Sequence, residues 1–345
     1  MSEFEGLDRF RIGELTERLP EEFEEAYEIG LRFRLPSWFD RFKPKALIFA
    51  GVGGSAVGGD LIRGWLRRRI DLPMEVCRGY EPPAYASEET LVFTVSYSGN
   101  TEETLNFMVK AHKIGCPVVS LSSGGVMEKA SKKLGVPHIK VPSGLLPRAA
   151  IAYLSAPIIP VLERLVDKVS KLRWEVEEAL ESLRNLRAKL SRSTSERKNP
   201  AKRLARRLHS KIPVVFGYGH TSPVARRFKN QLNENSKVAA RWDEFPELDH
   251  NEVMAYQAPI SQVKDQLIVI LRSRVESAEI TARIEATRKL MEEAVSGIQE
   301  VWGSGSSVLA NMLTLLYITD MASVYLAYLR GVDPGDTSLI EGLKK

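Results

Sequence analysis

The stretch LVFTVSYSGNTEET, residues 91–104, decides the fold expected for this chain. A short apolar run ends in Ser96, Ser98 and Thr101 around Gly99, and a helical pattern follows. Such a strand–loop–helix unit gathers hydroxyl groups and backbone amides at a helix N-terminus, which favours a dianion such as a phosphate group. No lysine follows Gly99 as it does in a P-loop, so a sugar phosphate is expected rather than a nucleoside triphosphate.

Strands and helices alternate through the first half of the chain. The expected strands are the apolar runs at 46–50, 74–77, 91–95 and 116–121. This alternation predicts βαβ units and a parallel sheet that helices cover on both faces. Ligands of such sheets bind beyond the carboxyl ends of the strands, where the loops 51–60 and 96–101 are expected to lie.

A second alternating pattern repeats the first. Residues 48–57, IFAGVGGSAV, and residues 214–224, VVFGYGHTSPV, both read as a buried strand, Gly-x-Gly, a small hydroxyl residue and a helix, with Ser222 as the expected N-cap. The run 266–271 mirrors the strand before the hydroxyl loop, but its own loop, RSRVES, lacks the hydroxyl cluster. We therefore expect a duplicated α/β domain in which only the first copy keeps a phosphate loop, with the copies facing each other across the active site.

The segment between the two copies has no glycine from residue 145 to residue 216. Apolar residues at helical spacing over 161–190 predict one long connecting helix, and SRSTSERKNP at 191–200 has the composition of a linker. The expected organisation is a helical N-terminal extension at 1–40, a first domain at 41–160, the connecting helix and linker at 161–200, a second domain at 201–330, and a C-terminal tail at 331–345.

Composition is typical of a soluble globular protein of 345 residues, with 43% hydrophobic and 27% charged residues. The apolar stretches are interrupted by charge or glycine before they reach the length of a membrane span, and the N-terminus lacks the features of an export signal. The two cysteines, Cys77 and Cys116, are expected to be buried fillers rather than a disulfide. A cytoplasmic protein with no membrane partner is therefore expected.

Charge is distributed unevenly along the chain. Residues 1–40 hold eleven acidic and five basic side chains, whereas residues 184–211 hold eleven basic ones and one acid, Glu196. A basic stripe can bind nucleic acid, but this one lacks interleaved aromatic residues and any DNA-binding motif. We expect a solvated helix face and linker, and no nucleic-acid partner.

The glycine-rich loop at 51–60 has two interpretations. The pattern Gly51-x-Gly53-x-x-Ala56, with Glu75 near the place of a ribose-binding acid, is close to a dinucleotide fingerprint. The Gly54–Ser55 pair instead lets a substrate approach the backbone closely and adds a hydroxyl donor. Because a nicotinamide fold has no use for a second phosphate loop at 96–101, the second interpretation is favoured.

The second segment with candidate chemistry is NENSKVAARWDEFPELDHNE at 233–252. Glu234 at the end of a helix could serve as a general base and His250 as a second proton-transfer group. The alternative is that Glu234 forms a surface ion pair with Lys237 or Arg241. A metal site is not expected, because the histidines and cysteines show none of the usual ligand spacings.

The loops Gly-Gly-Ser at 53–55 and Ser-x-Ser-Gly-x-Thr at 96–101 resemble those of sugar isomerase (SIS) domains. The duplicated chain, with ENSK at 234–237 and DHNE at 249–252, is similar to the bifunctional phosphoglucose/phosphomannose isomerases of archaea and some bacteria over nearly its whole length. This resemblance implies two SIS-type, flavodoxin-like αβα sandwich domains with parallel sheets, joined by a long helix. It implies no cofactor.

The resemblance also implies roles for individual residues. Substrate contacts would come from Gly53, Gly54, Ser55, Ser96, Ser98 and Thr101. Arg148, in LLPRAA, would stabilise negative charge on an enediolate, and Glu234 would move the proton between C1 and C2. His250, supplied across the interface of a homodimer, would open the sugar ring. In the C-terminal tail, Lys344 would assist ring opening, with Lys345 as a competing choice, and Thr337 would allow both C2 epimers.

These roles imply a metal-independent aldose–ketose isomerase. It would interconvert glucose 6-phosphate or mannose 6-phosphate with fructose 6-phosphate through a cis-enediol(ate). The alternative from another class is a non-catalytic SIS regulator that binds a sugar phosphate, and a dinucleotide-dependent enzyme is the third hypothesis.

Overall fold

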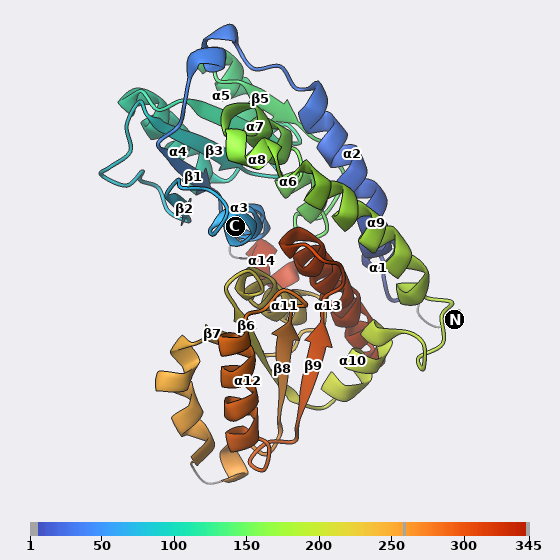
Figure 1. Ribbon diagram of the computed structural model, residues 1–345. Helices are drawn as coiled ribbons and strands as arrows, with labels where there is room; N and C mark the ends of the chain where they lie inside the picture. The colour runs from blue at the N-terminus through green and yellow to red at the C-terminus, as the bar shows by residue number, and fades with distance from the viewer. Residues whose placement is uncertain (1–5, 258–259, 343–345) are drawn as a thin grey trace. The chain divides into compact units, whose positions relative to one another are not determined.

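The computed structural model describes residues 6–257 and 260–342. The chain divides into two compact units (Figure 1). The first unit is Glu21–Trp174, and the second combines Met1–Pro20 with Glu175–Lys345. The acidic N-terminal extension is helical, as expected, and it is shared between the units, since α1 (Ile12–Glu17) belongs to the second and most of α2 (Leu19–Arg32) to the first.

The first unit is built on a parallel five-stranded sheet with the order β2-β1-β3-β4-β5. Its strands are β1 (Ala46–Ala50), β2 (Met74–Cys77), β3 (Thr90–Val95), β4 (Val118–Ser122) and β5 (His138–Lys140). The four expected strands are confirmed, with β4 displaced by two residues at its start. The edge strand β5 was missed because a run of three residues is too short to show a period.

Helices cover both faces of this sheet. Ile48 of β1 packs in the core cluster with Phe107 of α4 and Met127 of α5. On the opposite face Gly59 of α3 lies so close to Phe49 that an added Cβ would be 2.5 Å from the phenylalanine Cβ. The helices of this unit, besides α2, are η2 (Ser37–Arg41), α3 (Gly54–Leu66), α4 (Glu102–Ile114), α5 (Gly125–Leu134), α6 (Ile151–Ser155), α7 (Ile158–Leu165) and α8 (Asp167–Ser170). The predicted αβα layering is confirmed.

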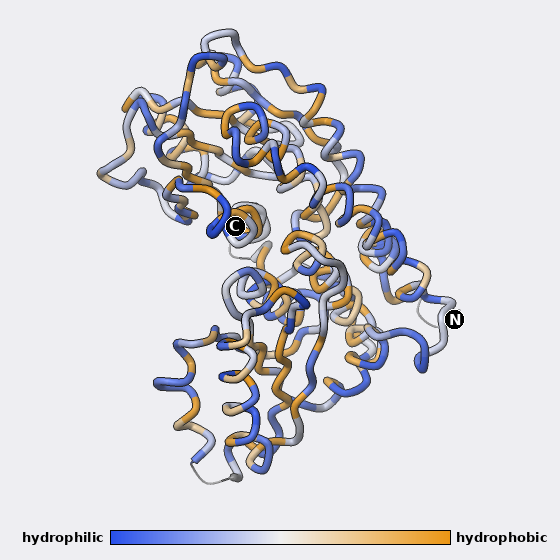
Figure 2. Tube along the Cα trace, in the orientation of Figure 1, coloured by the Kyte–Doolittle hydropathy of each residue, from blue (hydrophilic) through white to orange (hydrophobic). Residues whose placement is uncertain are grey.

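The second unit has a parallel sheet of its own, with the order β7-β6-β8-β9. Its strands are β6 (Ile212–Tyr218), β7 (Arg241–Phe245), β8 (Gln266–Arg272) and β9 (Gly297–Trp302). Strands β6 and β8 carry the apolar core, which Figure 2 shows as orange tube in the middle of this unit. The edge strand β7 lies within the polar segment 233–252, for which no strand was expected.

The helices of the second unit pack on this sheet and on one another. They are α1, α9 (Arg173–Leu190), α10 (Pro200–Leu208), α11 (Ser222–Glu234), η3 (Glu247–His250), η4 (Glu252–Gln257), η5 (Ile260–Gln262), α12 (Ala278–Met291), α13 (Val308–Arg330) and α14 (Ser338–Gly342). Helix α11 begins one residue earlier than expected: Thr221, not Ser222, is the N-cap.

The single long helix predicted at 161–190 is wrong in its bounds. The chain forms α7, α8 and α9 instead, because Val166 takes an extended backbone (φ −130°, ψ 100°) and ends α7. Leu165, Val169 and Val176 are all buried on either side of the breaks. The helical spacing of apolar residues therefore continues across the boundaries between α7, α8 and α9, so the spacing alone does not reveal them. Helix α9, with 18 residues, is the long helix that joins the two sheet-bearing parts of the chain.

Basic residues of the 184–211 stretch are in part bound by the chain itself. Lys202 Nζ donates to the carbonyl oxygens of Arg192 (2.7 Å) and Thr194 (2.8 Å), and Asn199 caps α10 by accepting from the amides of residues 201 and 202. The expected linker is thus an ordered turn. These contacts reduce the number of cations available to phosphates of a nucleic acid.

Helix α13 is long and apolar enough to cross a membrane by length and composition, contrary to the expectation that the apolar stretches are too short. It is 94% buried over its most apolar window. Asp320, near its middle, forms a buried ion pair with Arg227 of α11. This degree of burial is that of a core helix within the second unit.

Candidate active site

The two predicted substrate loops of the first unit lie at the point where its strand order reverses. Strand β1 leads into the loop before α3, and its neighbour β3 leads into the loop before α4. In the order β2-β1-β3-β4-β5 the β1/β3 boundary is the topological switch point, and ligands of such sheets bind in the crevice there. The sheet thus places both loops at the edge where ligands of such folds bind.

The phosphate loop, residues 96–101, presents hydroxyl groups and amides together. Ser96 is fully buried, and its Oγ donates to Thr101 Oγ1 at 2.9 Å. Ser98 is exposed, and its Oγ accepts from the amide of Asn100 at 3.2 Å. Thr101 is the N-cap of α4 but makes no side-chain capping bond. The first-turn amides of α4 therefore keep their capacity for an anion.

The preceding substrate loop is held against the phosphate loop by Ser55, whose Oγ accepts from the amide of Tyr97 at 3.2 Å. Gly53, with φ +58°, is the N-cap of α3. A Cβ on Gly54 would lie 3.2 Å from the carbonyl oxygen of Pro147 and 3.6 Å from Arg148 Cα. The structure thus brings together the predicted residues Gly53, Gly54, Ser55, Ser96, Ser98, Thr101 and Arg148.

Tyr97, which the sequence pattern did not single out, organises this part of the candidate site. Its hydroxyl donates to the carbonyl oxygen of Pro142 and accepts from the amide of Leu145, both at 2.9 Å. Its carbonyl oxygen accepts from the Ser123 amide and hydroxyl. Tyr97 therefore ties the phosphate loop to the segment that leads to Arg148, whose side chain is buried. A tyrosine amid the hydroxyl residues was the available signal, but its partners lie more than 40 positions away.

Glu234 lies at the C-terminal end of α11 in the second unit, half-buried. Lys237, in a left-handed conformation at φ +54°, donates through Nζ to the carbonyl oxygens of Glu234 (2.5 Å) and Asp336 (2.9 Å). This contact joins the end of α11 to the C-terminal tail, next to Thr337. Lys237, one of the two possible surface partners of Glu234, thus contacts the backbone carbonyl oxygen of residue 234.

His250 lies in η3, after the carboxyl end of β7, and it is exposed. The described contacts of its neighbour Asp249 run to α12, where Thr287 Oγ1 donates to Asp249 Oδ1 at 2.6 Å. Within one chain this segment is therefore anchored to α12. Lys344 and the competing Lys345 lie outside the described residues.

The dinucleotide hypothesis is disfavoured by the position of Glu75. This residue lies within β2, paired with Ile48, rather than at the carboxyl end of the strand. Its carboxylate accepts from the hydroxyl of Tyr85 at 2.6 Å. A ribose-binding acid has to project from the carboxyl end of the sheet toward the ligand.

Comparison with known proteins identifies the family. Residues 197–345 match the family described as bacterial phospho-glucose isomerase C-terminal SIS domain. The chain is 36% identical to a bifunctional phosphoglucose/phosphomannose isomerase of Caldicellulosiruptor bescii over 94% of this chain and 96% of the relative. This chain belongs to the bifunctional phosphoglucose/phosphomannose isomerase family. The resemblance drawn from the paired loops is thereby confirmed.

A further member of the phosphoglucose/phosphomannose isomerase family supports this assignment, and a solved structure supports the fold. A relative of the same name from Aquifex aeolicus is 32% identical over 87% of this chain and 90% of its own length. A putative phosphosugar isomerase from Clostridium difficile has a TM-score of 0.73 at 17% identity, covering 96% of this chain and 97% of that one. This structural likeness confirms the fold with two SIS domains.

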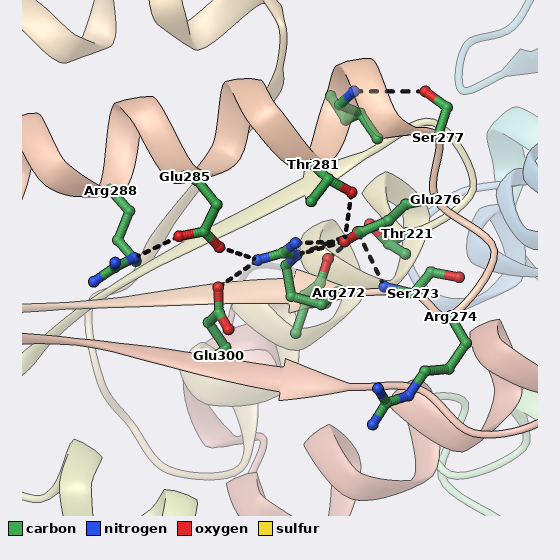
Figure 3. Close-up of polar contacts among 12 residues, drawn as sticks. Thr221, Arg272, Ser273, Arg274, Glu276, Ser277, Thr281, Glu285, Arg288 and Glu300 are labelled. Atoms are coloured by element: carbon green, nitrogen blue, oxygen red, sulfur yellow. Dashed lines mark hydrogen bonds and ion pairs between the residues drawn. The ribbon is translucent and has the colours of Figure 1, made fainter.

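In this member of the phosphoglucose/phosphomannose isomerase family, polar groups of the β8–α12 loop are paired with other side chains of the second SIS domain. Arg272 at the end of β8 is 1% exposed and forms ion pairs with Glu276, Glu285 and Glu300 (Figure 3). Ser277 caps α12 by accepting from the Ile280 amide. The position that carries the hydroxyl cluster in the first copy is thus occupied in the second by a network of Arg272 with three carboxylates.

Proposed function

We propose that this protein is an aldose–ketose isomerase that interconverts glucose 6-phosphate and mannose 6-phosphate with fructose 6-phosphate. The observation that carries the proposal is the group of hydroxyl and amide donors at the β1/β3 switch point, in a chain whose relatives are named phosphoglucose/phosphomannose isomerases. The 6-phosphate would bind Ser96, Ser98 and Thr101. Binding energy from this remote group would hold C1 and C2 in place for reaction.

The proposed chemistry is a proton transfer between adjacent carbons. His250 and Lys344 open the sugar ring. Glu234 takes the proton from the carbon beside the carbonyl, which gives a cis-enediol(ate), and returns it to the neighbouring carbon. Arg148 stabilises the negative charge of the intermediate. Thr337 leaves room for reprotonation of C2 from either face, which yields both epimers.

The proposal assigns the stabilisation of this charge to Arg148 rather than to a metal ion. The described residues contain no group of three His, Cys, Asp or Glu side chains placed to hold a metal. We propose a cytoplasmic homodimer in which His250 of the partner subunit completes the site, since His250 is exposed and its segment is anchored to α12.

The deciding experiment is incubation of fructose 6-phosphate with the protein in excess EDTA, with both aldose phosphates quantified. Glucose 6-phosphate and mannose 6-phosphate at catalytic turnover are expected. Glucose 6-phosphate alone would keep the mechanism and remove the role given to Thr337. Tight binding of fructose 6-phosphate without product would replace the isomerase by a non-catalytic SIS regulator, and turnover lost with EDTA would overturn the metal-free mechanism.

Removal of the Tyr97 hydroxyl is expected to reduce kcat more than it raises KM. In Tyr97→Phe the segment leading to Arg148 loses two hydrogen bonds, while the hydrogen bond from the Tyr97 backbone amide to Ser55 Oγ remains. A loss of about 1 kcal/mol for each hydrogen bond corresponds to roughly fivefold per bond, and so to a decrease of up to about 30-fold in kcat for the two. Steady-state kinetics on fructose 6-phosphate would measure it. Tyr85→Phe, at an exposed tyrosine of the same unit, is the control and should change kcat by less than about twofold.

A further inference from the structure

Behind the phosphate loop, four side chains of the first unit form a continuous row of hydrogen bonds. Ser131 Oγ lies 2.7 Å from Ser120 Oγ, which lies 2.8 Å from His138 Nδ1. The other ring nitrogen, Nε2, lies 3.3 Å from Ser122 Oγ, and this hydroxyl donates to the carbonyl oxygen of Gly124 at 2.7 Å. The three serines have no exposed surface. None of these residues has a role in the proposed chemistry.

Counting protons sets the direction of the bonds around Ser122 and His138. The single hydroxyl proton of Ser122 goes to Gly124, whose own amide donates back to the same oxygen at 3.1 Å. His138 Nε2 must therefore carry a proton and donate to Ser122, and Nδ1 of the neutral ring accepts from Ser120. Burial lowers the pKa of His138, which keeps the ring neutral. The row thus runs from Ser131 to Gly124, and the hydroxyls of Ser120 and Ser122 each both donate and accept.

The row ends at a point of close contact with the phosphate loop. Gly99, at φ +68°, approaches Gly124 so closely that an added Cβ would lie 1.9 Å from the Gly124 carbonyl oxygen. The carbonyl oxygen of Gly99 in turn accepts from the amide of Met127 at 2.8 Å. The orientation of the Gly124 peptide therefore sets where Gly99 can lie, and Gly99 stands between the hydroxyl residues Ser98 and Thr101.

We propose that His138 is a positioning residue of the phosphate loop. Through Ser122 it holds the Gly124 peptide against which Gly99 packs, and so it fixes the spacing of the donors that meet the phosphate. His138 acts through the protein and touches no substrate atom. The inference rests on the proposed function in one respect, namely that residues 96–101 bind a phosphate group.

The test compares three substitutions of one ring. His138→Ala removes both nitrogens and is expected to raise the Kd for inorganic phosphate, measured by calorimetry, and the KM for fructose 6-phosphate by roughly fivefold, with kcat within about twofold. The amide of His138→Gln reaches the Nε2 position and donates to Ser122, so binding should recover. The shorter amide of His138→Asn reaches only the Nδ1 position, so binding should stay weak. The contrast between Gln and Asn holds even if the alanine variant fails to fold.

Two further variants complete the design. Ser122→Ala breaks the same row and should raise the Kd by a similar factor, with no added effect in the double variant His138→Ala/Ser122→Ala. His112→Ala, at an exposed histidine of α4, is the matched control and should leave the Kd unchanged.

The outcomes separate this inference from the proposed function. A lowered melting temperature with an unchanged Kd, or equal Kd values for the Gln and Asn variants, would overturn the positioning role. A wild-type protein that binds no inorganic phosphate and no fructose 6-phosphate would overturn both. A wild-type protein that binds phosphate but makes no aldose phosphate would remove the isomerase and leave this test intact.

Discussion

Replacing Glu234 by glutamine is expected to lower kcat for fructose 6-phosphate isomerisation by about 10²–10⁴-fold, the range that a positioned general base contributes. Glutamine keeps the size of the side chain but cannot accept the proton. Glu234 ends α11, and the Lys237 ammonium holds the carbonyl oxygen of residue 234, so the backbone of the variant should keep its position. Substrate binding should therefore change by less than about threefold, because the phosphate contacts are untouched.

The measurement combines steady-state turnover with the Kd for fructose 6-phosphate from calorimetry. Glu244→Gln, at an exposed carboxylate on β7, is the matched control and should keep wild-type turnover. Wild-type kcat in the Glu234→Gln variant would remove this residue as the base. A loss of binding in parallel with turnover would instead give it a structural role.

Replacing Asp320 by asparagine is expected to cost about 3–5 kcal/mol in the free energy of unfolding, the usual cost of leaving one partner of a buried ion pair uncompensated. Arg227 and Asp320 are each 3% exposed, and Arg227 donates to both carboxylate oxygens at 2.6–3.1 Å. Burial raises the pKa of Asp320, and the Arg227 guanidinium opposes that rise. Without the carboxylate, the guanidinium remains buried between α11 and α13.

Urea unfolding monitored by circular dichroism would measure this loss. The double replacement Arg227→Met/Asp320→Leu removes both charges and should recover most of the stability. Glu196→Gln, which breaks the exposed pair with Arg206, is the control and should change stability by less than about 1 kcal/mol. A cost below about 1 kcal/mol for Asp320→Asn would show that the guanidinium finds other compensation.

Sequence reasoning succeeded where structure follows from local pattern. The strand–loop–helix unit around Ser96 and the Gly-Gly-Ser loop each carry their own signals, and parallel βαβ topology then places both loops at one sheet edge. The contact between Ser55 and the Tyr97 amide is the direct result. The replacement of the hydroxyl cluster in the second copy was also readable, because a loop rich in charge stands where the first copy has one rich in hydroxyl groups.

The features that the sequence did not predict mostly depend on contacts between residues far apart in the chain. The organising role of Tyr97 needs the segment 142–145, and the link between Glu234 and the tail needs Lys237 to reach residue 336. Strand β7 was missed because four of its five residues, RWDEF, are at least partly exposed, and three of them are charged, so the sequence shows no apolar alternation. The breaks beside Val166 leave the apolar period intact, so periodicity could not reveal them.

The division of the chain has a consequence for the order in which it folds during synthesis. The first unit is one uninterrupted stretch, whereas the second needs both ends of the chain: the Tyr317 hydroxyl of α13 donates to the carbonyl oxygen of Glu17 at 2.7 Å, and the Tyr328 hydroxyl to Asp8 at 2.6 Å. A ribosome releases residues 21–174 early enough for them to fold while translation continues. Helix α1 must wait until α13 emerges before these contacts can form.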